Sequence, residues 1–205
     1  MQTSIILIGG GGHCKACIDV IEQEGKYQIA GITDLAHRVG ESILGYPIIG
    51  TDDDLPKLLY KHKNALITLG QIRSATLRRK AYDQLKGLGA NLPVIISPHA
   101  LVSQHAQISE GTIVMHHALI NAHAQIGHNN IINSKALIEH EAIIGDHCHI
   151  STAAKINGQV SIGDECFVGS GATIANNIQL TNQVVVPAGT TVFKNINKSG
   201  IYVKR

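Results

Sequence analysis

The 205-residue sequence contains no tryptophan, two phenylalanines and five tyrosines, so aromatic residues make up only 3% of the chain. Proteins that bind single-stranded nucleic acids stack the bases on aromatic side chains, and this composition offers few such platforms. The formal net charge of +2 also gives no electrostatic footprint for a polyanion. We therefore expect no nucleic-acid partner.

Long apolar runs are missing as well. No stretch of 18 apolar residues occurs, and the opening MQTSIILIGGGG has neither a basic n-region nor a cleavage site. We therefore expect a cytoplasmic protein without membrane insertion. Four cysteines are too few for a disulfide scaffold. Cys14 and Cys17 have redox or metal spacing, but without a second such pair the simpler interpretation is reduced thiols on a helix face.

An aliphatic residue occupies every sixth position from Val102 to Val192 without a miss. A small residue usually stands two positions earlier, for example Ala136 before Ile138. A six-residue period fits neither a helix nor a simple strand, and it is typical of a solenoid. The repeat therefore predicts a parallel β-helix.

Three six-residue sides close a triangular coil of 18 residues, so residues 18 apart should stack. Ile120, Ile138 and Ile156 then form an interior ladder, and Cys148 and Cys166 stack as small core residues. Three glycines also recur at one corner, where we expect them to supply backbone angles that other residues resist; they are Gly127, Gly145 and Gly163.

Residues 1–96 have a different character from residues 97–205, and we expect two domains with this boundary. Short apolar runs at 4–8, 29–32, 65–69 and 92–96 read as strands. Expected helices lie between them at 14–24, 51–62 and 74–88, and 44–50 reads as a turn-rich connection. Alternating strands and helices predict an α/β, Rossmann-like domain with a parallel sheet.

The glycine turn after the first strand is where such a sheet binds phosphate, because backbone N–H groups and a helix N-terminus favour an anion. GGGGHCK does not complete the dinucleotide motif G-x-G-x-x-G, since Cys14 or Lys15 stands in place of the third glycine. A nucleotide ligand other than NAD is therefore favoured. His13 at the helix start and Asp34 after the second strand are placed to contact it.

The twelve histidines also allow a metal hypothesis. His123 and His128 have the spacing of two zinc ligands in β-helix hydratases that resemble γ-class carbonic anhydrase, but a third ligand at the matching separation is missing. His128 also shares its column with Asp146 and Asp164, which reads as a polar edge. We expect no metal.

A second constellation consists of Glu139, His140 and Glu141, followed by His149. Since Ile138 and Ile150 point inward, we expect His140 and His149 to face outward. A carboxylate that accepts the ring N–H of a histidine fixes its tautomer and raises the basicity of the other nitrogen.

The runs INAHAQIG and INSKALIEHEAIIGDHCHIS, together with GGGGHCK, resemble the sialic acid O-acetyltransferase (NeuD) family of hexapeptide acyltransferases, especially its PglD-like UDP-4-amino-sugar N-acetyltransferases. The likeness covers nearly the whole chain. It implies the left-handed form of the β-helix and a homotrimer with acetyl-CoA between adjacent prisms. It also implies a place in bacterial glycan or nonulosonic acid biosynthesis.

The resemblance also implies site residues. The catalytic histidine falls on His140 and its supporting carboxylate on Glu141. The residues implied for the nucleotide-amino-sugar substrate are Gly11, Gly12, His13, Asp34, Gly70 and Asn133, and those implied for acetyl-CoA are His149, Ser170 and Ala188. No Asp or Glu follows Glu165, so the cations Lys194, Lys198, Lys204 and Arg205 suit the coenzyme phosphates or form a solvated tail.

We therefore expect direct acetyl transfer to an amine, with His140 as the general base and no covalent intermediate, since Cys148 falls in the core column. Three alternatives stay open at this point. They are O-acetylation of sialic acid or another nucleotide sugar, zinc-dependent hydration, and nucleotide sensing without catalysis.

Overall fold

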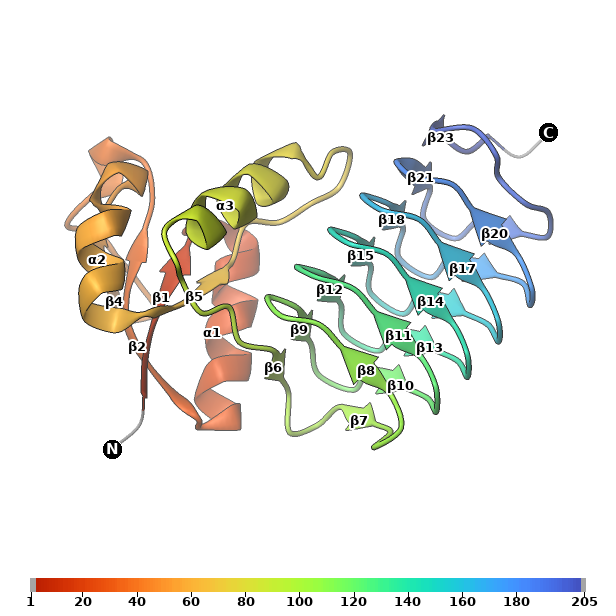
Figure 1. The fold of residues 1–205 in the computed structure, drawn as a ribbon, viewed down its shortest axis with the longest axis horizontal. Coiled ribbons are helices and arrows are strands. Elements are labelled where there is room, and N and C mark those ends of the chain that lie inside the picture. Colours follow the sequence, from red (N-terminus) through yellow and green to blue (C-terminus); the bar gives the residue numbers. More distant parts are fainter. Residues whose placement is uncertain (1–2, 204–205) are drawn as a thin grey trace.

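The computed structural model describes residues 3–203, so Lys204 and Arg205 lie outside the described residues. An N-terminal α/β domain is followed by a stack of short parallel strands that forms a triangular prism (Figure 1). This arrangement confirms the predicted fold class, a Rossmann-like domain followed by a hexapeptide-repeat β-helix.

The N-terminal domain is built on a five-stranded sheet with the order β3-β4-β2-β1-β5. Its strands are β1 (Thr3–Ile8), β2 (Tyr27–Thr33), β3 (Ser42–Ile43), β4 (Tyr46–Gly50) and β5 (Asn64–Ile67). All neighbours are parallel except β3 and β4, which form an antiparallel pair. The carboxyl ends of β1, β2 and β5 therefore lie along one edge, where ligands bind in open α/β sheets.

Three α-helices pack on this sheet: α1 (Gly12–Glu24), α2 (Leu55–His62) and α3 (Thr76–Gly87). Two 3₁₀ turns, η1 (Ala36–Arg38) and η2 (Asp52–Asp54), follow β2 and β4. Helix α1 buries Cys14, Cys17 and Ile18 and ends at Gly25, which adopts the left-handed conformation with φ of 70°. Burial raises the pKa of both thiols, and both are free cysteines, as the helix-face interpretation predicts.

Two sequence-based expectations for this domain were wrong. Residues 44–50 are not merely a connection, because β4 pairs with β2 inside the sheet. Residues 92–96 do not supply a fourth strand to the sheet: only Ile95–Ile96 form a strand, β6, and it pairs with β9 of the prism. An apolar run of this length suits either environment, so its sequence did not distinguish them. The division at residue 96 stays a prediction.

The prism consists of three parallel sheets, which we name the β15, β13 and β14 sheets. The β15 sheet contains β6 (Ile95–Ile96), β9 (Ile113–Val114), β12 (Ile131–Ile132), β15 (His149–Ile150), β18 (Phe167–Val168), β21 (Val184–Val186) and β23 (Gly200–Ile201). The β13 sheet contains β7 (Leu101–Val102), β10 (Leu119–Ile120), β13 (Leu137–Ile138), β16 (Lys155–Ile156), β19 (Thr173–Ile174) and β22 (Thr191–Val192). The β14 sheet contains β8 (Gln107–Ile108), β11 (Gln125–Ile126), β14 (Ile143–Ile144), β17 (Ser161–Ile162) and β20 (Gln179–Leu180).

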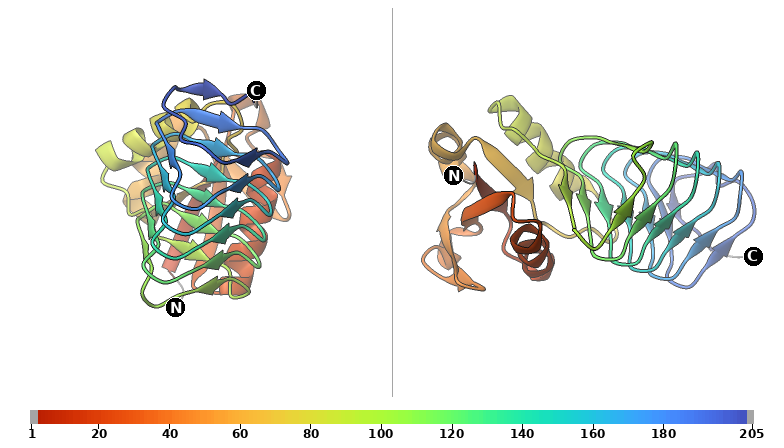
Figure 2. Two further views of the ribbon diagram at one scale, coloured as in Figure 1. Left: turned by 90° about the vertical axis from the view of Figure 1, so that its right-hand side faces the viewer. Right: turned by 90° about the horizontal axis from the view of Figure 1, so that it is seen from below.

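The strands stack with an offset of 18 residues, so that Ile138 pairs with both Ile120 and Ile156. The aliphatic residues of the repeat, which are the second residue of most strands, point into a shared core together with the small residues two positions earlier, including the fully buried Cys148 and Cys166. The hexapeptide repeat therefore predicted the register and the core correctly. The stacking of complete coils is visible in Figure 2.

At each of the three edges of the prism, residues 18 apart in sequence stack in a column. We name each edge after one residue of its column. The Asp146 edge, between the β14 and β15 sheets, contains His128, Asp146, Asp164 and Asn182. The Ser170 edge, between the β15 and β13 sheets, contains Ser134, Thr152, Ser170 and Ala188. The His140 edge, between the β13 and β14 sheets, contains Ala122, His140, Gly158 and Asn176.

The turns at these edges require a left-handed residue at every sixth position, with φ between 53° and 72°. The residues are Gly111, His117, His123, Asn129, Lys135, Glu141, His147, Ala153, Gln159, Glu165, Gly171, Asn177, Gln183 and Gly189. Gly127, Gly145 and Gly163 are not among them, so our explanation for these glycines was wrong. A β-carbon at any of the three would lie within 2.9 Å of the backbone of the next coil, so close approach requires the glycine.

The Asp146 edge is held by side chains that bond the backbone of the preceding coil. Asp146 Oδ1 accepts from the N–H of His128 at 2.6 Å, and Asp164 Oδ1 accepts from the N–H of Asp146 at 2.8 Å. This confirms that the column is a polar structural edge.

The N-terminal domain docks on the β15 sheet and the Asp146 edge of its own prism. Helix α1 buries its apolar face with Ile113 and Ile131 of that sheet. Helix α3 lies along the edge: Tyr82 donates to Glu110 at 2.9 Å, and Arg79 bonds Glu165 at 3.0 Å. Because these contacts extend over several coils, the domain is fixed away from the His140 edge. No helix within residues 3–203 is long and apolar enough to cross a membrane.

Candidate functional site

The glycine turn, Gly9 to Gly12, connects β1 to α1 and contains two kinds of glycine. Gly9 has φ of 99°, and a β-carbon on Gly10 would lie 2.6 Å from the Asp34 carboxylate, so both positions require glycine. Gly11 and Gly12 are exposed, and a β-carbon on either would meet nothing within 4 Å. The first N–H groups of α1 are therefore accessible at the positive end of the helix dipole, as an anion site requires.

Asp34 supports this turn from the end of β2. Its Oδ2 accepts from the N–H of Gly10 at 3.0 Å and from Arg38, and its Oδ1 accepts from the N–H of Leu35 at 2.7 Å. Arg38 also donates to the carbonyl of Gly10 at 3.1 Å. The sequence predicted Asp34 as a site residue but gave no sign of Arg38, which bonds both Asp34 and the carbonyl of Gly10.

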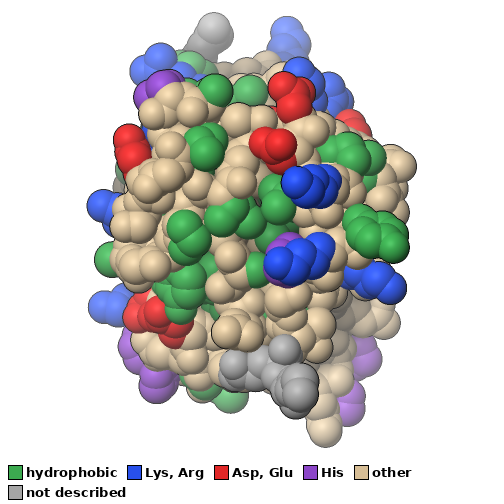
Figure 3. All heavy atoms as spheres, turned by 90° about the vertical axis from the view of Figure 1, so that its left-hand side faces the viewer, with side chains coloured by type: hydrophobic (Ala, Val, Ile, Leu, Met, Phe, Trp, Pro, Cys, Tyr) green, Lys and Arg blue, Asp and Glu red, His purple; other side chains and the backbone are tan. Residues whose placement is uncertain are grey.

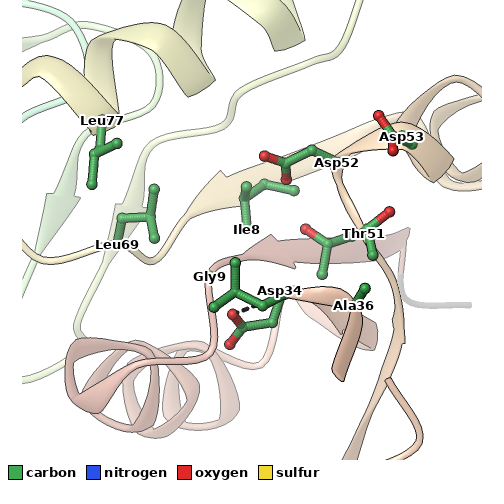
Figure 4. Close-up of a pocket in the computed structure, with 11 residues that line it drawn as sticks. Ile8, Gly9, Asp34, Ala36, Thr51, Asp52, Asp53, Leu69 and Leu77 are labelled. Atoms are coloured by element: carbon green, nitrogen blue, oxygen red, sulfur yellow. Dashed lines mark hydrogen bonds between the residues drawn. The ribbon is translucent and has the colours of Figure 1, made fainter. Parts of the chain in front are cut away.

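A pocket of about 480 Å³ opens at this edge of the sheet, next to Asp34 (Figure 4). Its walls include the ends of β1 and β2, the start of η2, and apolar side chains of Leu69 and Leu77. Asp52 and Asp53 stand at its rim. Figure 3 shows the outer face of the N-terminal domain, where hydrophobic side chains gather among scattered charges of both signs.

His13, in the first turn of α1, is turned toward the prism. A β-carbon on Gly70 would lie 3.6 Å from the His13 Cβ, an ordinary van der Waals contact, so the loop after β5 passes directly beside His13. Burial, with smaller contributions from Arg78 and His149, lowers the pKa of His13 to about 3. His13 is therefore neutral at physiological pH, and its Nε2 has no partner among the described residues.

Asn133 and His149 meet at the Ser170 edge. The side-chain amide of Asn133 lies 3.0 Å from His149 Nε2, and the His149 Nδ1 lies 2.5 Å from the carbonyl oxygen of Gln71. Burial lowers the pKa of His149 to about 4. His149 points out of the prism as expected, but Gln71 in the loop after β5 covers it, which leaves 7% of the residue exposed. Nothing in the sequence indicated that Gln71 takes part in the site.

Arg78 of α3 is another residue that the sequence did not reveal. It is 1% exposed and donates to the carbonyls of Ile67 and Leu69 at 2.8 and 2.7 Å and to Asn129 Oδ1 at 2.6 Å. Burial lowers its pKa to about 10, so the guanidinium remains charged. Arg78 therefore joins the loop after β5 to the prism.

Ser170 and Ala188 continue the Ser170 edge beyond Asn133. Both are exposed, and Ser170 Oγ lies 3.0 Å from Ser151 Oγ. A β-carbon on Gly169 would lie 2.5 Å from the backbone nitrogen of Ala188, so successive coils approach closely here. Ser170 and Ala188 therefore present an exposed surface on successive coils of this edge.

His140 and Glu141 lie on the edge opposite the β15 sheet. The Nδ1–H of His140 donates to Glu141 Oε2 at 3.2 Å, and Gln159 Nε2 donates to the same oxygen at 3.0 Å. The hydrogen bond from His140, followed by that from Gln159, lowers the pKa of Glu141. The His140 side chain is 54% exposed, so its Nε2 is available as a base toward a ligand.

The predicted residues therefore fall into two sets. One set forms a spatially continuous series that runs from the N-terminal domain onto the Ser170 edge. Its members are the glycine turn, His13, Gly70, His149 and Asn133. His140 and Glu141 are separated from that set by the whole width of the β13 sheet. Within the described part of the chain, no three histidine, cysteine or acidic residues are grouped to hold a metal, so His123 and His128 have no third ligand.

Sequence profiles match both halves of the chain. The PglD N-terminal domain matches residues 4–85, and the bacterial transferase hexapeptide, with six repeats, matches residues 141–176. A hexapeptide repeat of succinyl-transferase matches residues 159–194. A search of curated proteins by sequence found no match.

Solved structures match almost the whole chain. GDP-perosamine N-acetyltransferase from Caulobacter crescentus, solved with CoA and GDP-perosamine, is 31% identical with a TM-score of 0.91, and the match covers 98% of this chain and 94% of that one. A variant of that enzyme with a histidine replaced by asparagine is 30% identical with a TM-score of 0.90, and the match covers 98% of this chain and 95% of that one.

The acetyltransferase domain of PglB from Neisseria gonorrhoeae, in complex with acetyl coenzyme A, is 30% identical with a TM-score of 0.87, and the match covers 96% of this chain and 93% of that one. The profiles and these structures agree on both domains and on their order. The chain therefore belongs to the PglD-like family of hexapeptide-repeat sugar acetyltransferases.

Proposed function

We propose that this protein transfers the acetyl group of acetyl-CoA to the amino group of a nucleotide-linked 4-amino-4,6-dideoxy sugar, with UDP as the carrier predicted from the sequence. The observation that carries the proposal is the His140–Glu141 pair, an oriented base with a free Nε2 on an exposed edge. The Caulobacter relative, which binds CoA and GDP-perosamine, supports both substrate classes.

The chemistry follows from the orientation of the imidazole. Glu141 accepts the Nδ1–H, so Nε2 carries the lone pair and takes a proton from the sugar amine as its nitrogen attacks the thioester carbonyl. The carbon–sulfur bond then breaks, and the coenzyme leaves as a thiolate that takes up a proton. Holding both substrates in place supplies much of the rate enhancement, so no covalent intermediate on the protein is needed.

We further propose that the active enzyme is a homotrimer whose sites are shared between subunits. Docking of α3 on the Asp146 edge holds the nucleotide pocket away from His140 of the same chain. A neighbouring prism can bring its His140 edge to the Ser170 edge of this one, since a heterologous contact that closes forms a ring. Ser170 and Ala188 then lie where the resemblance assigns acetyl-CoA.

An apolar ladder on the outer face of the β13 sheet suits such a contact. Leu101, Leu119 and Leu137 stack with an 18-residue offset, and Leu101 is 67% exposed in the single chain. An exposed apolar patch of this kind marks an interaction surface. The ladder lies between the Ser170 and His140 edges, so a subunit that covers it also comes close to both sets of site residues.

The experiment that tests the activity mixes the protein with acetyl-CoA and a panel of nucleotide sugars. The panel holds the same 4-amino sugar on UDP, GDP and dTDP, each with its 4-hydroxy counterpart. We expect release of the CoA thiol and a product heavier by one acetyl group, with the amino sugars only. Acetylation of the hydroxy sugars alone would identify an O-acetyltransferase, and no thiol release with any acceptor would contradict the proposal.

A further inference from the structure

Three hydrogen bonds in series connect the Ser170 edge with the loop after β5. The backbone N–H of Ser134 donates to Asn133 Oδ1 at 2.7 Å, and Asn133 Nδ2 lies 3.0 Å from His149 Nε2. His149 Nδ1 lies 2.5 Å from the backbone oxygen of Gln71. Both ends of the series are backbone groups, one from each domain of the chain.

The backbone groups fix the direction of every bond in the series. Ser134 N–H can only donate, so Oδ1 of Asn133 is its acceptor and the Nδ2 amide must donate to His149. The Gln71 carbonyl can only accept, so the proton of the imidazole is on Nδ1. His149 is thus held as the neutral Nδ1–H tautomer, with both of its nitrogens occupied.

Gln71 is itself held in place by the prism. Its side-chain Nε2 donates to the carbonyl of His147 at 2.9 Å, across 76 residues of sequence. The backbone of the loop therefore cannot move away from His149 without losing this bond. Phe167 packs edge-on against the His149 ring with centroids 5.2 Å apart, which limits rotation of the imidazole.

Asn133 is the one member of the series with a free donor. Its Nδ2 carries two hydrogens, and His149 is the only acceptor bonded to this nitrogen within residues 3–203. Asn133 is only partly buried, while His149 is 7% exposed. A ligand on the Ser170 edge can therefore reach the second N–H of Asn133 without breaking any bond, whereas it reaches neither nitrogen of His149.

We propose that His149 and Gln71 are positioning residues that aim the second N–H of Asn133 at an acceptor oxygen of the bound substrates, and that His149 does not itself bond acetyl-CoA. This inference rests on the proposed acetyl transfer. It differs from the role that the resemblance assigns to His149, which is direct contact with acetyl-CoA. A positioning group that moves by about 1 Å can lower the rate by about 100-fold.

A matched pair of substitutions tests this proposal through kinetics. In His149→Gln, the glutamine side-chain amide extends to the position of the imidazole Nε2, so its oxygen can accept a hydrogen bond from Asn133. In His149→Asn, the shorter asparagine side chain extends only to the position of Nδ1 and cannot reach Asn133. We expect His149→Gln to keep kcat/KM within about 3-fold, and His149→Asn to lose about 10- to 100-fold, as Asn133→Ala does. Equal losses in both variants would mean that the ligand needs the imidazole itself, and no loss in either would mean that the series has no role.

The tautomer can be tested without any substrate. In the ¹⁵N spectrum of the wild-type protein, we expect His149 to show a protonated Nδ1 and an unprotonated Nε2, with no titration between about pH 5.5 and 8. A protonated Nε2, or titration near the ordinary value of about 6.5, would overturn the proposal. Since this measurement needs no turnover, its failure is distinguishable from a failure of the acetyltransferase activity.

Discussion

A β-carbon on residue 158 would lie 2.8 Å from both Cε1 and Nε2 of His140, so the imidazole rests directly on Gly158 of the next coil. The 18-residue stacking brings the two residues together, since 158 follows 140 by one complete coil. The ring is half-exposed and can move, so an added methyl group should displace it rather than unfold the prism.

Gly158→Ala is therefore expected to lower kcat by about 10- to 100-fold, because a base displaced by about 1 Å loses the geometry of proton transfer. Steady-state kinetics with a thermal melt measures both effects. Gly87→Ala, where a β-carbon meets nothing within 4 Å, is the matched control. Unchanged kcat in Gly158→Ala would show that the ring position observed here is not the reactive one.

His140→Ala should lower turnover by about 100-fold or more, while acetyl-CoA still binds with its wild-type affinity. The reason is that the substitution removes the base and leaves the Ser170 edge untouched. Kinetics and calorimetric titration of acetyl-CoA check the two parts. If turnover does not change, His140 takes no part in the reaction.

Arg78→Met should destabilise the protein by about 3 kcal/mol. The substitution leaves the buried carbonyls of Ile67 and Leu69 and the Oδ1 of Asn129 without their hydrogen-bond donor. Its neighbour Arg79 bonds Glu165 at the surface, so Arg79→Met should cost less than about 1 kcal/mol. Denaturant unfolding of both variants provides the comparison. Equal losses would indicate that Arg78 is not what joins the domains.

Asp34→Ala should raise the KM for the nucleotide sugar by about 10-fold and leave the KM for acetyl-CoA unchanged, since Asp34 bonds the Gly10 N–H and aligns the glycine turn. Arg38→Ala should act in the same direction through the carbonyl of Gly10. If the KM for acetyl-CoA rises as much as the KM for the nucleotide sugar, this role for the glycine turn is wrong.

Stability should fall as the pH is lowered below about 6.5. His149 has a folded-state pKa of about 4, below that of the unfolded chain, so the unfolded state binds more protons between these values. The expected loss from His149 alone is about 2 kcal/mol between pH 7.5 and pH 5, and His13 adds to it. Unfolding of wild type and His149→Gln at both pH values tests this, because the variant should lose less; equal pH dependence would contradict it.

The prism could be predicted almost completely from the sequence, because one translation of 18 residues fixes the strand register, the core and the outward position of His140. The sequence did not show why residue 127 is a glycine. Histidine, asparagine and glutamate occupy left-handed turn positions in this prism, so a recurring glycine does not by itself mark such a position. Close approach between coils depends on neighbouring side chains, which the repeat alone does not specify.

The contacts between the domains could not be predicted from the sequence for a different reason. Arg78 bonds Asn129 across 51 residues, and Gln71 bonds His147 across 76, with no periodic pattern that connects them. On the sequence alone, Arg78 reads as a solvated charge on a helix. The separation of His140 from the pocket beside Asp34 likewise depends on the edge of the prism on which α3 docks, and so required the structure.

Mixing of subunits tests most directly the claim that His140 of one subunit completes the site of another. Alone, His140→Ala should retain about 1% of wild-type activity or less, and Asn133→Ala about 1 to 10%. If the two variants are unfolded and refolded together in equal amounts, about one quarter of the sites in random trimers combine an intact His140 edge with an intact Ser170 edge. We predict recovery of roughly that fraction of wild-type activity. A mixture that forms trimers but stays as inactive as its components would show that each site lies within one chain, contrary to this account.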